Sequence, residues 1–115
     1  MKIVITTRIP GVHRWLACPI PEVEYLQNYH RHMFHIKVWK NVEHDDRDVE
    51  IIMFKRDVKA YIRENYFDVS HDACFFGDMS CEMIAKIIYH EFQCEAVEVL
   101  EDGENGALYE GLSYD

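Results

Sequence analysis

The sequence lacks the features that mark several classes of protein. No apolar run approaches the roughly 20 residues that a membrane-spanning helix needs. The first ten residues, MKIVITTRIP, lack the apolar stretch of a secretory signal. Basic residues number 12 against 21 acidic ones and are scattered along the chain, whereas a nucleic-acid binder normally carries a basic patch. We therefore expect a cytoplasmic protein with neither a membrane nor a nucleic acid as partner.

Paired cysteines, repeats and low-complexity segments are also missing. The cysteines form no Cys-x-x-Cys motif, so we expect free thiols that serve mainly as small core residues. What the chain does have is material for a core, because 49% of its 115 residues are hydrophobic and 13% are aromatic. That length and composition predict one folded domain covering residues 1–115.

Periodicity predicts four strands and two helices. Alternating, β-branched segments predict strands at 2–9, 31–43, 95–101 and 107–112. Apolar residues at helical spacing predict a helix at 53–65 and a second one that begins near Ser80. Pro10-Gly11 is expected to break or bulge the first strand, and 14–29 and 66–79 are expected to be mainly loop. The order β-β-α-α-β-β predicts a two-layer α+β domain with a four-stranded antiparallel sheet and both helices on one face.

The second predicted strand has two unlike faces. Alternation places His32, Phe34 and Ile36 on one side, and Met33 and Trp39 on the other. A monomer would expose the second set to water. Oligomerisation that extends or closes the sheet is therefore expected.

Three histidines have a spacing that suits a metal site. His30 and His32 are two apart in a strand, so both side chains point to the same side. His13 ends the first strand, which is expected to pair with the second. Three imidazoles with a water or substrate in the fourth position describe a catalytic zinc site. The alternative is that these are ordinary surface or core histidines, because His-x-His is common by chance.

Several segments, in order, resemble the 6-pyruvoyl-tetrahydropterin and 6-carboxy-tetrahydropterin synthases. That family has a lone His after its first strand and a His-Gly-His at the start of its second, which resemble GVHRW and YHRHMFHIKV. IIMFKRDVK is similar to its Asp-Phe-x-x-Leu-Lys segment, with Met53 in place of the Asp. Met79-Ser80-Cys81-Glu82 resembles its Pro-Thr-Ser-Glu helix start. VEVLEDGENGALYEG resembles its last hairpin and places the family's Glu at Glu101.

The resemblance implies a fold, a cofactor and a substrate. The fold is the tunnelling fold, in which ββααββ units oligomerise into a β-barrel, here expected to be a trimer or a hexamer. The cofactor is Zn²⁺ bound by His13, His30 and His32, where it lowers the pKa of substrate hydroxyls. The substrate is 7,8-dihydroneopterin triphosphate or a related pterin, and the pathway that the resemblance suggests is the synthesis of 7-deazaguanine (queuosine-type) precursors. Glu101 would anchor the pterin ring from across the pocket; its position alone favours a solvated hairpin Glu, and the match to the family motif reverses that preference.

The catalytic base implied by the family is harder to place. Family members carry a Cys four residues before the first His of the pair, and Leu26 occupies that position. Some relatives use a Glu in this loop, which suggests Glu24 or Glu22. The family's Asp-His pair resembles His71 with Asp68 or Asp72 in FDVSHDACFFGD, although His71 as a plain loop residue is the alternative. A base relocated to Cys74 is a further alternative.

Three hypotheses follow. The first is a zinc-dependent lyase of the pterin synthase type. The second is a binding module that keeps the fold and captures a pterin or a purine-like ligand without turnover. The third is a structural oligomer without metal, against which the three-histidine pattern argues. Turnover separates the first two hypotheses, and metal content tests the third.

Overall fold

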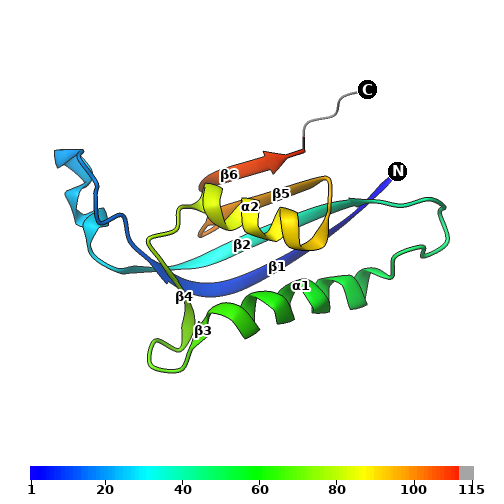
Figure 1. Ribbon diagram of the computed structural model, residues 1–115, viewed down its shortest axis with the longest axis horizontal. Coiled ribbons are helices and arrows are strands. Elements are labelled where there is room, and N and C mark those ends of the chain that lie inside the picture. Colours follow the sequence, from blue (N-terminus) through cyan, green and yellow to red (C-terminus); the bar gives the residue numbers. More distant parts are fainter. Residues whose placement is uncertain (112–115) are drawn as a thin grey trace.

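The computed structural model describes residues 1–111, which form one sheet with helices against it (Figure 1). Its strands are β1 (Lys2–His13), β2 (His30–Asn41), β3 (Phe67–Asp68), β4 (Ala73–Gly77), β5 (Ala96–Glu101) and β6 (Asn105–Glu110). Its helices are the short 3-10 helix η1 (Pro21–Gln27) and the α-helices α1 (Ile51–Tyr66) and α2 (Cys81–Phe92). The α+β class is confirmed. The helix η1 lies in a segment that was expected to be mainly loop.

The predicted four-stranded antiparallel sheet is wrong. In the described part of the chain the sheet has six strands in the order β3-β4-β1-β2-β5-β6, and it is mixed because β4 runs parallel to β1. Both additional strands come from 66–79, which was predicted to be a loop. The short apolar run that forms β4 finds partners only when it lies against the end of β1, while β3 folds back on it. Such a distant pairing leaves no local periodicity to read. The sheet is open, with β3 and β6 at its edges.

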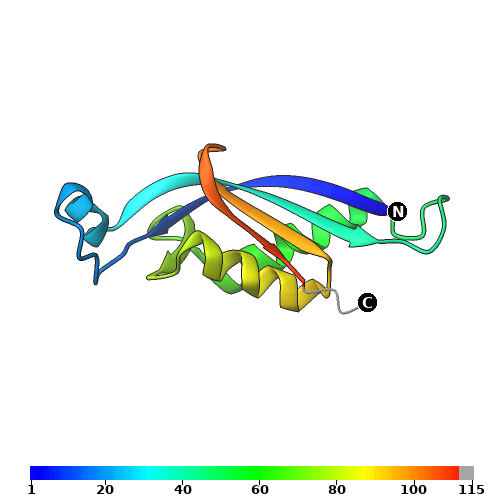
Figure 2. The ribbon, with the colours of Figure 1, turned by 90° about the horizontal axis from the view of Figure 1, so that it is seen from above.

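Both α-helices cover one face of the sheet, as predicted, and leave the other face bare (Figure 2). Helix α1 packs mainly on β1, and α2 packs on β5 and β6. The alternation along β2 is confirmed, since Phe34, Ile36 and Val38 are at most 1% exposed within the core. Met33 directly precedes Phe34 in sequence and is 40% exposed on the bare face.

Side-chain caps set where the helices begin. The Ser80 hydroxyl accepts a hydrogen bond from the Met83 N–H at 3.2 Å, so α2 begins next to it, as expected. The carboxylate of Glu50 accepts one from the Met53 N–H at 2.8 Å, so α1 begins slightly before its predicted start at 53. The cap at Ser80 begins the helix where its first turn and the end of β1 line the same pocket.

Strand β1 runs straight through Pro10-Gly11, where a break or bulge was predicted. Proline is tolerated because β1 has a partner on one side only until Gly11, where its pairing with β4 begins. A Cβ on Gly11 would lie 2.6 Å from the Phe76 ring and 2.7 Å from that of Phe34. The glycine therefore lets two aromatic rings close over the strand. The irregularity occurs between Val12 and His13, in the pairing with β4.

The last hairpin begins earlier than expected. Strand β6 begins at Asn105 and ends at Glu110, whereas 107–112 was predicted; Leu112 lies outside the described residues.

Among residues 1–111, no helix is both long enough and apolar enough to span a membrane.

Candidate metal centre

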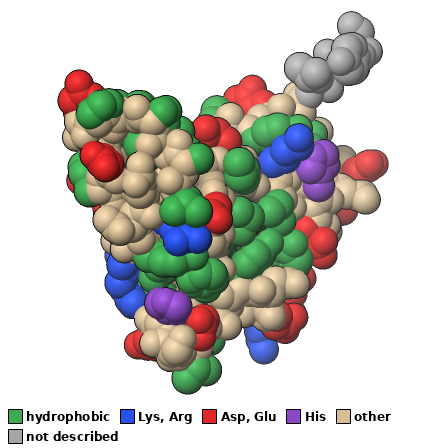
Figure 3. Space-filling model, turned by 60° about the vertical axis from the view of Figure 1, so that its left-hand side comes forward, with side chains coloured by type: hydrophobic (Ala, Val, Ile, Leu, Met, Phe, Trp, Pro, Cys, Tyr) green, Lys and Arg blue, Asp and Glu red, His purple; other side chains and the backbone are tan. Residues whose placement is uncertain are grey.

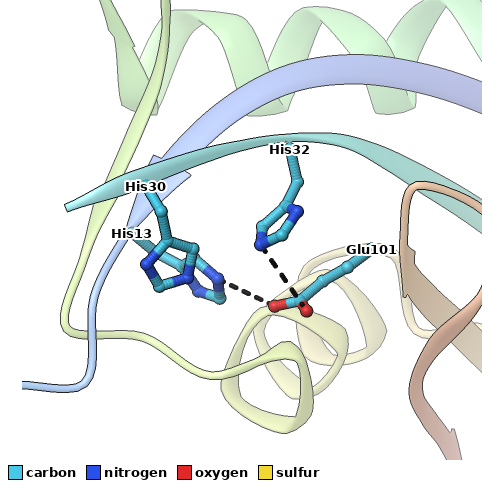
Figure 4. A group of neighbouring side chains, drawn as sticks. All are labelled: His13, His30, His32 and Glu101. Carbon is cyan, nitrogen blue, oxygen red and sulfur yellow. Dashed lines mark ion pairs between the residues drawn. The ribbon is translucent and has the colours of Figure 1, made fainter. Parts of the chain in front are cut away.

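Four side chains from three neighbouring strands converge on the helix-covered side of the sheet (Figure 4). His13 is the last residue of β1 and pairs with His30, the first residue of β2. His32 follows two positions later on the same face, and Glu101 ends β5, which pairs with β2. The strand register thus brings together residues that are far apart in the sequence.

The ligand atoms of this group lie within 4.8 Å of one another. The Nε2 atom of His13 is 2.8 Å from one oxygen of Glu101, and that of His32 is 3.6 Å from the other. Among the described residues, this is the group of histidine, cysteine and acidic side chains with the geometry to hold a metal ion. The coarse prediction of a metal-capable cluster at His13, His30 and His32 is confirmed.

Each ring is fixed by a hydrogen bond at its other nitrogen. His13 Nδ1 donates to the carbonyl oxygen of Met79 at 2.8 Å, and His30 Nδ1 donates to that of Asn28 at 2.9 Å. His32 Nδ1 lies 2.7 Å from a carboxylate oxygen of Asp102. A carbonyl or carboxylate oxygen can only accept, so in the neutral rings the proton is on Nδ1 and the lone pair is on Nε2.

Within residues 1–111, two of the inward-facing nitrogens lack a hydrogen-bond partner. The Nε2 atoms of His13 and His32 are buried and have no hydrogen-bond partner among residues 1–111. The Glu101 oxygen at 2.8 Å does not satisfy His13, because a lone pair and a carboxylate oxygen are both acceptors. Such buried acceptors are costly unless a cation or a proton lies between them. Burial also lowers the pKa of His13, which disfavours the proton.

The donor set fits a divalent transition metal. Three imidazoles and a carboxylate suit Zn²⁺ and other first-row ions, and hydrogen bonds at the remote ring nitrogens are usual for ligating histidines. The backbone N–H of Met33, and then His32, hold the pKa of Asp102 below its ordinary value. Asp102 therefore stays an anion that orients the His32 ring.

A pocket of about 490 Å³ opens beside the cluster. Its walls are His13, His30 and Glu101 of the cluster, the first turn of α2, the start of β6, and the apolar side chains of Trp15, Leu26, Met79 and Met83. Figure 3 shows hydrophobic side chains gathered at the centre of this side of the molecule. The pocket can therefore take a small, partly apolar ligand against the cluster.

The expected acid–base pair forms, but away from this pocket. His71 Nδ1 lies 2.8 Å from a carboxylate oxygen of Asp68, in the exposed turn between β3 and β4. The hydrogen bond from His71 is the main cause that lowers the pKa of Asp68. Asp72 pairs with neither; its carbonyl accepts from Arg31. Neither Asp68 nor His71 lines the pocket.

The other proposed bases are also outside the pocket or buried. Glu24 and Glu22 are exposed on η1 and do not line it, whereas Leu26 does. Cys74 is fully buried in the core, and burial raises the pKa of its thiol. Sequence reasoning missed Cys81, which lines the pocket. Burial, followed by the carboxylate of Glu101, raises the pKa of that thiol to about 12.

Glu101 was expected to lie across the pocket from the histidines, but it lies among them. It is the last residue of β5, which pairs with the strand that carries His32, so the carboxylate and the histidines are on the same wall. Sequence reasoning also missed the Met79 carbonyl and the Asp102 carboxylate, which hydrogen-bond to histidine rings of the cluster. For Asp102 a signal was available, because it directly follows Glu101 at the end of a predicted strand.

No protein-family model matches the chain, and no curated protein matches it in sequence.

Proposed function

We propose that this chain is a zinc-dependent lyase of the 6-pyruvoyl/6-carboxy-tetrahydropterin synthase type, acting on 7,8-dihydroneopterin triphosphate or a related pterin. One observation carries the metal part of the proposal. Three rings are held by hydrogen bonds at Nδ1, and the buried Nε2 lone pairs of His13 and His32 face the carboxylate of Glu101. The substrate part rests on the motif resemblance and on the adjoining pocket.

The roles of the residues follow from their placement. His13, His30 and His32 would hold the ion, with Glu101 within reach as a further ligand. The ion would supply a Lewis acid that lowers the pKa of a substrate hydroxyl. Glu101 also lines the pocket, so its carboxylate can accept hydrogen bonds from the ring N–H and amino group of a pterin. Trp15 and Leu26 exclude water from the ring.

The acid–base chemistry requires a second copy of the chain. The Asp68–His71 pair is outside the pocket of its own chain, and Glu24 is exposed on η1. A trimer or a hexamer that joins open sheets can bring the pair of one copy to the pocket of another. The bare face of the sheet carries apolar side chains, such as Met33 at 40% exposure, which supports such an assembly.

One observation favours the alternative of a binding module without turnover. Leu26 lines the pocket where the family's catalytic Cys would be, and the thiol of Cys74 is in the core. The pocket therefore keeps its metal and its apolar wall but lacks the usual thiol base. In that case a pterin or a purine-like ligand would bind and leave unchanged.

The test measures metal, binding and turnover on the same preparation. Protein purified without chelator should contain about one zinc per chain, and 7,8-dihydroneopterin triphosphate should be consumed with release of triphosphate. Binding without release would establish the alternative. Absence of bound zinc, combined with failure of added zinc to bind, would contradict both.

A mixing experiment tests the shared site. His32→Ala and His71→Ala should each abolish turnover, and refolding the two variants together should restore part of it, because some pockets then combine an intact cluster with an intact pair. Full activity of His71→Ala alone would remove the pair from the mechanism. No recovery on mixing, with the oligomer intact, would place the base elsewhere.

A further inference from the structure

Asp102 makes three hydrogen bonds to β2. Its backbone N–H donates to the Met33 carbonyl at 2.8 Å, and one carboxylate oxygen accepts from the Met33 N–H at 2.9 Å. The other oxygen accepts from His32 Nδ1 at 2.7 Å. Asp102 thereby extends the pairing of β5 with β2 by one step, and its φ of +56° turns the chain into the last hairpin.

The acceptor behind His32 differs from those behind the other two rings. His13 and His30 donate to neutral carbonyl oxygens, whereas His32 donates to a carboxylate. Hydrogen bonds to an ionised acceptor are shorter and roughly twice as strong as neutral ones. A carboxylate also keeps the proton on Nδ1 and makes Nε2 a better donor to a cation.

We propose that Asp102 is a positioning residue that sets the metal affinity of the centre by fixing the tautomer and orientation of His32. The inference rests on the proposed function only in requiring that a metal binds His32. It assigns the role to a side chain that does not touch the ion.

Asp102→Asn isolates the carboxylate from the backbone. Asparagine tolerates a positive φ, so the turn can be kept. The amide has one oxygen for two donors, the Met33 N–H and the His32 Nδ1–H, and its NH₂ must face one of them. An NH₂ that faces His32 favours the tautomer with the proton on Nε2, which blocks a metal there.

The test reads the tautomer and the affinity separately. In the metal-free protein, long-range ¹H–¹⁵N correlation spectra should show an unprotonated His32 Nε2 in the wild type and a protonated one in Asp102→Asn. Competition with a chromophoric chelator should show zinc bound about 10 to 100 times more weakly by the variant. Asp102→Gly, which also suits a positive φ, should weaken zinc in the same way if the Asn variant does not fold.

Glu104→Gln is the matched control. It removes one negative charge from the same turn, and the Glu104 side chain makes no hydrogen bond or ion pair within residues 1–111. It should hold zinc within about twofold of the wild type, because it changes only the net charge near the site and no contact to a histidine. Equal weakening by Glu104→Gln, or wild-type affinity and tautomer in Asp102→Asn, would overturn the inference. If the wild type itself fails to bind zinc, the proposed function fails instead.

Discussion

Two histidine–carboxylate pairs in this molecule have nearly the same geometry and opposite surroundings. His32 lies 2.7 Å from Asp102, and His71 lies 2.8 Å from Asp68. The ring of His32 directs its buried Nε2 atom toward other possible metal ligands, while the ring of His71 is in an exposed turn. The pair itself is therefore not what makes a metal centre. What matters is what the second ring nitrogen meets.

The same contrast holds for the supporting structure. Phe34 packs beneath the cluster, with ring centroids 5.2 Å from His13 and 5.8 Å from His32, and its side chain is fully buried. The turn with His71 is supported by a stacked Phe75 ring at 5.1 Å and by Arg31 donating to the His71 carbonyl at 2.9 Å. Strands and core fix the first pair, whereas a few surface contacts fix the second.

The largest expected effect is on metal affinity. His32→Ala removes a ligand and should weaken zinc by more than roughly 100-fold, which exceeds the 10 to 100-fold typical of losing only an orienting partner. His71→Ala should leave the affinity within about twofold, because His71 is outside the cluster. Chelator competition on both variants measures the difference. A comparable loss in His71→Ala would show that His71 also contributes to metal binding.

The next effect is on stability. Phe34→Ala should lower the free energy of unfolding by about 3–5 kcal/mol, because a buried ring leaves a cavity beneath the histidines. Val69→Ala, in the turn with His71, should change it by less than about 0.5 kcal/mol, since Val69 is 84% exposed. Urea unfolding of the metal-free proteins compares them. A large loss in Val69→Ala would mean that this turn is covered in the assembled protein.

The smallest effect is on pH dependence. Burial holds the pKa of His13 below its ordinary 6.5, so below that pH the unfolded chain binds a proton that the folded chain resists. The free energy of unfolding of the metal-free protein should therefore fall as the pH drops through 6.5, by at most about 1.4 kcal/mol per pH unit for this group. For Asp68, the contribution is present above its ordinary 3.8 and is lost as the pH falls further.

The variant His13→Gln isolates the contribution of His13 to the pH dependence of the free energy of unfolding. It should flatten the slope between pH 7 and pH 5, as followed by urea unfolding of the metal-free protein. An unaltered slope in His13→Gln would show that the ring is protonated as easily in the folded chain as in the unfolded one.

The convergence of the three histidines was predictable from strand periodicity, and the family resemblance made it a proposed zinc site. His30 and His32 share a face by alternation, and His13 ends a strand that pairs with theirs. The helix start at Ser80 was predictable from its cap for a similar reason. These features depend on near neighbours in the sequence or on the commonest strand pairing.

What could not be predicted depends on distant partners. Strand β4 exists because a short apolar run meets the end of β1, and no local signal marks that contact. The position of Glu101 among the histidines follows from the β2–β5 register, which pairs it with Phe34. The Met79 carbonyl behind His13 depends on where the loop before α2 crosses the end of β1.

The order of the ligands along the chain has a consequence for how the centre is assembled during synthesis. His13, His30 and His32 belong to a β1–β2 pairing that can form from early contacts, whereas Glu101 arrives only when β5 has been made. A metal ion bound by the β1–β2 hairpin before β5 is made would hold the two strands in register, because a slip by one residue turns His30 and His32 to the other face. The ion would then act as a template on which the later strand closes the site.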